Sequence, residues 1–302
     1  MLVFTHPACL GHDPGPDHPE SPARLEAVVS ALRAQFPALE WREAPPAKLG
    51  DLCRVHEREL IDSVLERPVE GHRMLDVDTV MSLGSAAAAL RAAGAGIAAV
   101  DAVMAGQADT AFCAVRPPGH HATAQTAMGF CLFNNIAVAA AHARDKHGLE
   151  RVAIVDFDVH HGNGTQAIFE REPAVQYLST HESGIYPHSG SVYERGVGNI
   201  HNALLPPGSG GFRFRNTWAD QMLPMLDAFR PQLLLISAGF DAHMRDPQAD
   251  LMLEAEDFGW LTAELRKLAV RHAQGRVVSM LEGGYDLQAL RESSIAHVDA
   301  LR

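Results

Sequence analysis

Short apolar runs recur along the chain, and within each run apolar positions follow one another without alternating with polar ones. Strands that are buried on both faces of a sheet have this continuous pattern, whereas half-exposed strands alternate. The pattern therefore predicts five buried strands, at residues 109–115, 151–157, 174–180, 232–238 and 276–281.

Segments of helical character separate these runs, and several end at a glycine, which commonly terminates a helix. Ser21 followed by Pro22 predicts the cap and first position of a helix that runs to about Phe36. Because strands and helices alternate, the fold class is α/β with a parallel sheet, and no linker or repeat divides residues 1–302 into further domains. Other helices are expected at residues 85–104, 135–147, 216–229, 256–273 and 286–301.

The composition is that of an acidic globular protein: 25 Lys and Arg against 37 Asp and Glu give a net charge of −12, and 47% of the residues are hydrophobic. This excludes a disordered chain and argues against nonspecific binding of nucleic acid. The four cysteines form no CxxC pair, which predicts free thiols. With no basic signal-peptide region and no apolar run of 18 residues, we expect a cytoplasmic protein without a membrane partner.

Side chains that can bind a metal or transfer a proton follow each of the predicted strands. In an open parallel sheet, ligands bind beyond the carboxyl ends of the strands, so the residues after each run should be considered together. Each of the five ends carries an Asp, His or Tyr, in the segments RPPGHH, DFDVHHGNG, HESGIYP, GFDAH and EGGYDL. The chain also has 17 histidines, and histidine is the commonest metal ligand.

Asp158 and His160 are two residues apart, so in an extended segment both point to the same side, and Asp241 follows another strand. Two carboxylates and one imidazole neutralise a divalent cation such as Zn²⁺ and leave coordination positions open for water and a substrate oxygen. The alternative is that these side chains only cap helices or bind surface water. Five strand ends that all carry such side chains favour a catalytic metal site.

Two further motifs are typical of hydrolytic chemistry. His120 and His121 follow a rigid RPPG turn, and a histidine beside an activated water is a natural general base. Tyr285 follows two glycines, whose flexible backbone can bring the tyrosine hydroxyl close to a developing oxyanion. A plain turn is the alternative interpretation of the GGY segment.

Taken together, PPGHH with GFCLFNN, DFDVHHGNGTQ, SAGFDAH and LEGGYDL resemble the histone-deacetylase-like amidohydrolases of the arginase-deacetylase superfamily. The likeness is to the class II deacetylase, acetylpolyamine amidohydrolase and acetoin-utilization branch, and it extends from HPESPARL at residues 18–25 to Tyr285. It implies one domain with an open parallel sheet flanked by helices on both faces. It also implies zinc-dependent hydrolysis of the acetamide of acetyl-lysine or a related acylated amine, with acetylpolyamines as the alternative substrates.

The resemblance implies roles for individual residues. His121 would act as general base and acid with His120 as its electrostatic partner, Asp156 would support His120, and Tyr285 would polarise the substrate carbonyl. Asn163 stands where class I enzymes have an aspartate beside the second histidine. The zinc ligands would be Asp158, His160 and Asp241, and a structural K⁺ would be held by Asp156, Asp158, His160 and Ser179.

The family's substrate channel is matched by Phe130 and Tyr186 as its two aromatic walls, with the Gly129 carbonyl facing the substrate. Phe130 as a plain core residue is the alternative. At the rim, Gln248 replaces the glutamate of polyamine-selective relatives, and this weakens the polyamine interpretation unless another acidic residue, such as Asp78, reaches the mouth. Arg24 resembles an arginine that lines an internal cavity, or else it forms a salt bridge on a helix surface.

Three competing interpretations are weaker. A dinuclear manganese ureohydrolase needs DxHxD, but Gly162 occupies the fifth position, and a second metal would have only His243 as an obvious ligand. Gly94 and Gly96 begin a G-x-G-x-x-A match to dinucleotide-binding proteins, but they lie inside a predicted helix, which indicates close helix packing. A binding module without turnover would lack a catalytic group, and here all of them are present.

Overall fold

The computed structural model describes residues 1–302, and its centre is one eight-stranded sheet in which all neighbouring strands are parallel. The strand order is β2-β1-β5-β10-β9-β6-β7-β8. The strands are β1 (Leu2–Thr5), β2 (Glu40–Glu43), β5 (Thr110–Cys113), β6 (Val152–Asp156), β7 (Val175–Glu182), β8 (Ile200–Leu205), β9 (Leu233–Ala238) and β10 (Val277–Leu281). A separate antiparallel ribbon joins β3 (Arg73–Met74) to β4 (Val80–Met81).

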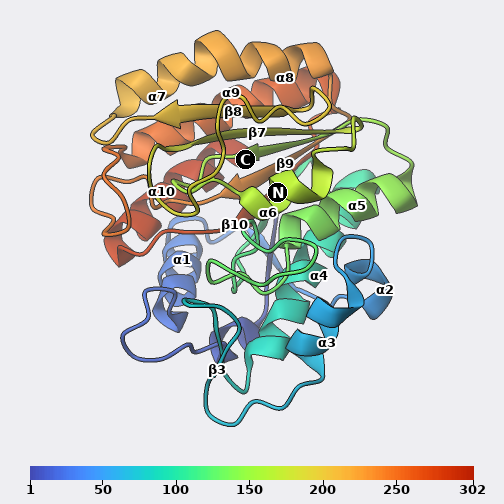
Figure 1. Ribbon diagram of the computed structural model, residues 1–302. Coiled ribbons are helices and arrows are strands. Elements are labelled where there is room, and N and C mark those ends of the chain that lie inside the picture. The colour runs from blue at the N-terminus through green and yellow to red at the C-terminus, as the bar shows by residue number, and fades with distance from the viewer.

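Helices cover both faces of the sheet (Figure 1). Helices α4 and α5 pack on one face, and α1, α9 and α10 pack on the other. Helices α7 and α8 lie beside α9 and contact strands β7 and β8. The helices are α1 (Pro22–Gln35), α2 (Leu49–Leu52), α3 (Arg58–Leu65), α4 (Ser85–Met104), α5 (Asn135–His147), α6 (Asn163–Phe169), α7 (Gly211–Thr217), α8 (Leu223–Phe229), α9 (Ala255–His272) and α10 (Leu287–Leu301). The predicted α/β fold class with an open parallel sheet is therefore confirmed.

All five predicted strands are present within a few residues of the expected bounds, and α4 and α5 have the predicted bounds. The prediction missed β1, β2 and β8. Strands β2 and β8 are the two edges of the sheet, and their polar or alternating sequences, EWRE and IHNALL, lack the continuous apolar run of a central strand. All four cysteines are free, as predicted.

Two helix predictions need correction. Pro22 does occupy the first position of α1, but the Ser21 side chain makes no capping hydrogen bond. The helix expected at 216–229 starts earlier, at Gly211, and consists of α7 and α8 joined by a π-helical turn at Trp218–Met222.

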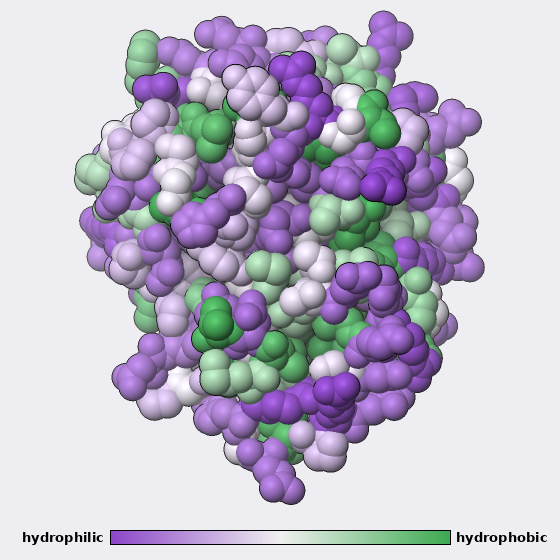
Figure 2. Space-filling model, viewed as in Figure 1, coloured by the Kyte–Doolittle hydropathy of each residue, from purple (hydrophilic) through white to green (hydrophobic).

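Helix α4 is packed closely on both sides. A side chain at Gly94 would come within 1.9 Å of the Pro45 carbonyl oxygen, and one at Gly96 would come within 2.9 Å of Met280 Sδ. These contacts confirm helix packing as the role of the two glycines. By length and composition alone α4 could cross a membrane, contrary to the sequence analysis, but 61% of its apolar window is buried in the fold. On the face drawn in Figure 2, hydrophilic side chains cover most of the surface.

The strands that carry the motifs are neighbours in the middle of the sheet. In the register, Asp156 at the end of β6 lies opposite Ser237 on one side and Ser179 on the other, and Ala238 of β9 lies opposite Leu281 of β10. Because these strand ends are level with one another, the loops that follow them meet at one edge of the sheet.

Candidate active site

A cluster of two carboxylates and one imidazole lies at this edge. Asp158 and His160 come from the loop after β6, and Asp241 comes from the loop after β9. His160 Nδ1 lies 3.1 Å from Asp158 Oδ1 and 3.2 Å from Asp241 Oδ2, and the three ligand atoms lie within 4.8 Å of one another. Both aspartates are buried. The structure thus brings together the three residues that the sequence proposes as metal ligands.

The cluster fits a divalent cation. Asp241 Oδ2 is buried and makes no hydrogen bond, and it lies 3.2 Å from another ligand atom, His160 Nδ1, so this carboxylate oxygen at the centre of the cluster is available as a ligand. The outer oxygens are held by backbone donors: Gly283 N donates to Asp158 Oδ2 over 2.8 Å and Val159 N donates to Asp241 Oδ1 over 2.9 Å. Two buried carboxylates with a single imidazole need a further positive charge, which a cation supplies.

Close backbone approach shapes the cluster. A side chain at Gly283 would stand 2.1 Å from Asp241 Oδ2, and one at Gly239 would stand 2.0 Å from Asp158 Oδ2. Only glycine at both positions lets the backbone contact the two carboxylates.

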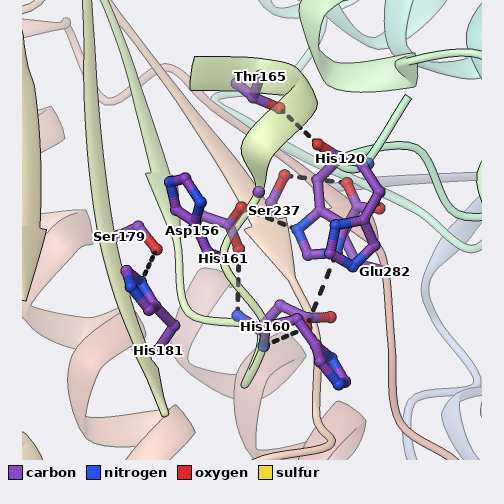
Figure 3. Close-up of polar contacts among 12 residues, drawn as sticks. His120, Asp156, His160, His161, Thr165, Ser179, His181, Ser237 and Glu282 are labelled. Carbon is purple, nitrogen blue, oxygen red and sulfur yellow. Dashed lines mark hydrogen bonds and ion pairs between the residues drawn. The ribbon is translucent and has the colours of Figure 1, made fainter. Parts of the chain in front are cut away.

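The tandem histidines lie beside this cluster, and both are buried. Asp156 Oδ2 lies 3.0 Å from His120 Nδ1 and also accepts a hydrogen bond from the Tyr177 hydroxyl. The backbone amides of Gly119 and His120 donate to Glu282 Oε2 over 2.7 and 3.2 Å. Figure 3 shows His120 between Asp156 and Glu282.

The two histidines have different electrostatic surroundings. Burial disfavours a charged His120, but Asp156 and Asp158 outweigh this and raise the pKa of His120 well above its ordinary value. Burial and then the neighbouring His120 and His160 lower the pKa of His121 well below its ordinary value. The partner of His121 Nδ1 is the neutral amide oxygen of Asn163, at 2.8 Å, which adds no charge. The site therefore favours a charged His120 beside a neutral His121.

Tyr285 is held by residues on both sides of it. Its backbone amide donates to Asp246 Oδ2 over 2.6 Å, while Arg24 Nε donates to the Gly284 carbonyl over 2.5 Å. The Arg24 guanidinium is fully buried and lies 4.7 Å from the centre of the Tyr285 ring. This burial rules out the interpretation of Arg24 as a helix-surface residue. Arg24 therefore packs against Tyr285 from the protein interior.

A cavity of about 150 Å³ leads to the cluster. One member of the cluster, His160, lines it, together with the proposed catalytic and channel residues and the acidic rim candidate: Asp78, His121, Gly129, Phe130, Tyr186, Gln248 and Tyr285. The ring of Phe130 lies edge-on to Tyr285, and that of Tyr186 lies edge-on to His121. Phe130 is therefore a lining residue and not part of the closed core.

Other predicted residues lie near the site without touching the cavity. Ser179 pairs with Asp156 in the sheet register, and its hydroxyl lies 2.9 Å from His181 Nδ1. The second-metal candidate, His243, uses Nδ1 to accept a hydrogen bond from Arg245 N and is not part of the ligand cluster.

Two buried carboxylates of the site, Glu282 and Asp246, were not predicted from the sequence. Glu282 opens the EGGYDL segment directly after β10, so its strand-end position was a usable signal. Burial is the largest influence on Glu282 and raises its pKa to about 7. Asp246 accepts hydrogen bonds from the amides of Tyr285, Asp286 and Gln248, and its place in the loop after Asp241 gives no sequence signal.

Comparisons with known proteins agree with this geometry. Residues 18–301 match the histone deacetylase domain. A histone deacetylase-like amidohydrolase of Pseudomonas aeruginosa is 44% identical over 286 residues, covering 92% of this chain and 74% of that protein. The human polyamine deacetylase HDAC10 is 39% identical over 305 residues, covering 93% of this chain and 44% of that protein. The crystal structure of the HDA15 HD domain superposes with a TM-score of 0.94 and 35% identity, covering 99% of this chain and 87% of that one.

Proposed function

The chain belongs to the histone deacetylase family and is an amidohydrolase of the deacetylase type, and from this premise we propose that it hydrolyses acetyl-lysine in a metal-dependent reaction. The observation that carries the proposal is the cavity whose lining joins His121, His160 and Tyr285. Residues suited to proton transfer and metal binding line one end of this cavity, and the aromatic rings of Phe130 and Tyr186 form its walls.

Asp158, His160 and Asp241 would hold the cation, for which the unpartnered Asp241 Oδ2 provides a free ligand atom. When bound, Zn²⁺ supplies Lewis-acid polarisation of a carbonyl oxygen and raises the acidity of water. We extend the proposal to a structural K⁺ near Asp156, Asp158, His160 and Ser179, on the family resemblance alone. We also extend it to a cytoplasmic location, on the four free cysteines of the chain.

His121 is suited to move the proton. If Nδ1 carries the hydrogen and donates it to Asn163 Oδ1, the other ring nitrogen, Nε2, is left as an acceptor. His121 takes a proton from the attacking water and returns it to the nitrogen of the leaving amine as the C–N bond breaks. The products are then the free amine and acetate. The charged His120 next to it keeps His121 neutral before the reaction begins.

Tyr285 is suited to polarise the substrate carbonyl. Burial is the largest influence on the phenol and raises its pKa well above the ordinary value, so the hydroxyl keeps its proton and acts as a donor. A donor that is already in place when negative charge develops on the carbonyl oxygen stabilises the transition state.

Phe130 and Tyr186 provide flat apolar walls for the methylene chain of a lysine. The rim residue Gln248 carries no charge, which favours a neutral peptide environment over a distal ammonium. A second candidate substrate class is the acetylated polyamines, because the carboxylate of Asp78 also lines the cavity and would attract a cation. HDAC10, one of the similar proteins, is named a polyamine deacetylase.

The test is turnover of a fluorogenic acetyl-lysine peptide, acetylputrescine and acetylspermidine by the metal-loaded protein. We expect the peptide to be hydrolysed with the highest kcat/KM. Gln248→Glu should raise the kcat/KM of the polyamines relative to the peptide, and Asp78→Asn should lower it. Preference of the unaltered chain for polyamines would establish the second candidate. Binding of all three substrates without turnover would indicate a non-catalytic binding module.

A further inference from the structure

A second cluster of metal-ligating side chains lies outside the active site. Asp101 comes from α4, and His142 and His147 come from α5, the helix packed beside α4 in Figure 1. Asp101 Oδ1 lies 2.7 Å from His142 Nε2 and 2.8 Å from His147 Nε2. The three atoms lie within 4.8 Å of one another, as in the catalytic cluster.

The cluster is separate from the catalytic residues and shares none with them. Helix α5 begins at Asn135, whose neighbour Asn134 donates to the Ala122 carbonyl in the loop of the tandem histidines. His147 is the last residue of the same helix, so at 1.5 Å per residue it lies about 18 Å further along the axis.

Both imidazole rings turn their Nε2 atoms towards the same oxygen, Asp101 Oδ1. The His142 side chain is 8% exposed, and its Nδ1 is buried without a partner, so only Nε2 is available for binding. The Asp101 side chain is 53% exposed and that of His147 is 24% exposed. The cluster therefore has a fixed inner ligand and an open outer side, where water can complete the coordination of an ion.

The charge of Asp101 has no permanent counter-charge. Its only ion-pair partners are the two histidines, and an imidazole is charged only when protonated. Asp227 is a useful comparison, because one of its oxygens also contacts two side chains, His272 at 2.7 Å and Arg271 at 2.6 Å. There the guanidinium supplies a permanent charge. Asp101 with two neutral imidazoles is left as an anionic site that lacks a cation.

We propose that Asp101, His142 and His147 bind a divalent late first-row transition metal such as Zn²⁺ at a site distinct from the catalytic centre. Two imidazoles and one carboxylate suit these ions, and three protein ligands with water give a complete coordination shell. Because the ligands come from two helices, the bound ion links α4 to the carboxyl end of α5.

The test is the number of zinc ions per chain after equilibrium dialysis of tag-free protein, measured by mass spectrometry of the metal. We expect two ions in the unaltered chain, one in the His142→Gln/His147→Gln double variant and one in the Asp158→Asn/Asp241→Asn double variant. His272→Gln is the matched control, since it removes an imidazole from the Asp227 cluster, and should retain two. One ion in the unaltered chain, or two in the His142→Gln/His147→Gln variant, would overturn the proposal.

Because His142 is buried, Asp101→Asn at an exposed position and His147→Gln at a half-buried one provide milder variants. In the Asp158→Asn/Asp241→Asn background, we expect Co²⁺ to give a visible absorption band and to raise the melting temperature. Adding Asp101→Asn or His147→Gln should raise the Co²⁺ concentration needed for both effects at least tenfold. Equal Co²⁺ responses with and without these substitutions would contradict the site. This readout does not depend on deacetylation, so failure of the proposed reaction leaves it unaffected.

Discussion

Tyr285 depends on residues that do not line the cavity. Asp246 accepts hydrogen bonds from the amides of Tyr285 and Asp286, and Arg24 binds the carbonyls of Gly284 and Glu282. These contacts fix the backbone on both sides of the tyrosine. The position of its hydroxyl is therefore set by the loop, while the hydroxyl itself remains free for a substrate.

Removing that hydroxyl tests its role. We expect Tyr285→Phe to lower kcat for the acetyl-lysine peptide by about 10² or more, because a donor to the developing oxyanion is lost. Metal content should stay the same, since Tyr285 is not one of the clustered ligands. Steady-state kinetics and metal analysis of the same preparation provide the measurement. Full activity of this variant would show that the hydroxyl takes no part in the reaction.

Asp246 is a positioning residue, and its effect should appear in kcat. Asp246→Ala removes the acceptor of three backbone amides, those of Gln248, Tyr285 and Asp286, and frees the loop, so we expect kcat to fall about tenfold with a small change in KM. Asp246→Asn keeps one acceptor oxygen and should recover part of the loss. A large rise in KM at constant kcat would instead place Asp246 in substrate binding.

The candidate metal ligands could be predicted from the sequence more readily than the carboxylates that hold the surrounding loops in place. Asp158, His160 and Asp241 follow apolar runs, and the parallel sheet brings such positions together, as their 4.8 Å grouping shows. Glu282 stands at a strand end and could have been singled out, but Asp246 could not, because its role depends on contacts with backbone amides from a distant segment. Such contacts leave no spacing pattern.

At the level of helices and strands, burial decided what could be predicted. The central strands β5, β6, β9 and β10 are buried at every residue and were found from their apolar runs. The edge strand β2 has only exposed and half-exposed residues, so its sequence carries no such run. The short helix α3 lies outside the strand–helix alternation and was missed for that reason.

The packing of α4 can be tested with two glycines that differ in their surroundings. A side chain at Gly94 would collide with the Pro45 carbonyl, whereas one at Gly50 in α2 would meet nothing within 4 Å. We expect Gly94→Ala to lower the free energy of unfolding by about 1–3 kcal/mol. Gly50→Ala should leave it unchanged or raise it by up to about 1 kcal/mol. Denaturant unfolding of both variants provides the comparison, and equal effects would refute the close packing of α4.

Across the whole molecule, buried neutral histidines link stability to pH. His56 donates from Nδ1 to the Thr123 carbonyl and accepts at Nε2 from Asn134 N, and burial lowers its pKa to about 4. Burial lowers the pKa of His297, which lies between two hydroxyl groups, to about 3. In the unfolded chain both histidines titrate near 6.5.

The sign of the pH effect follows from these lowered values. The contribution of the two buried neutral histidines to the free energy of unfolding is fully present above about pH 6.5. It is lost as the pH falls towards 4, because only the unfolded chain then takes up the protons. We expect each histidine to contribute a fall of about 1.4 kcal/mol per pH unit in this window. Denaturant unfolding of chelated protein between pH 7.5 and 5 measures the slope, and His297→Gln should reduce it. A slope in His297→Gln equal to that of the unaltered chain would contradict this prediction.

We propose that the buried cluster of Asp158, His160 and Asp241 makes the protein a metal-dependent deacetylase. The most direct measurement is hydrolysis of the acetyl-lysine peptide by chelated protein before and after addition of excess Zn²⁺, in the unaltered chain and in Asp241→Asn. We expect no turnover after chelation, recovery in the unaltered chain, and no recovery in the variant. Undiminished turnover after chelation, or full recovery in Asp241→Asn, would contradict this proposal.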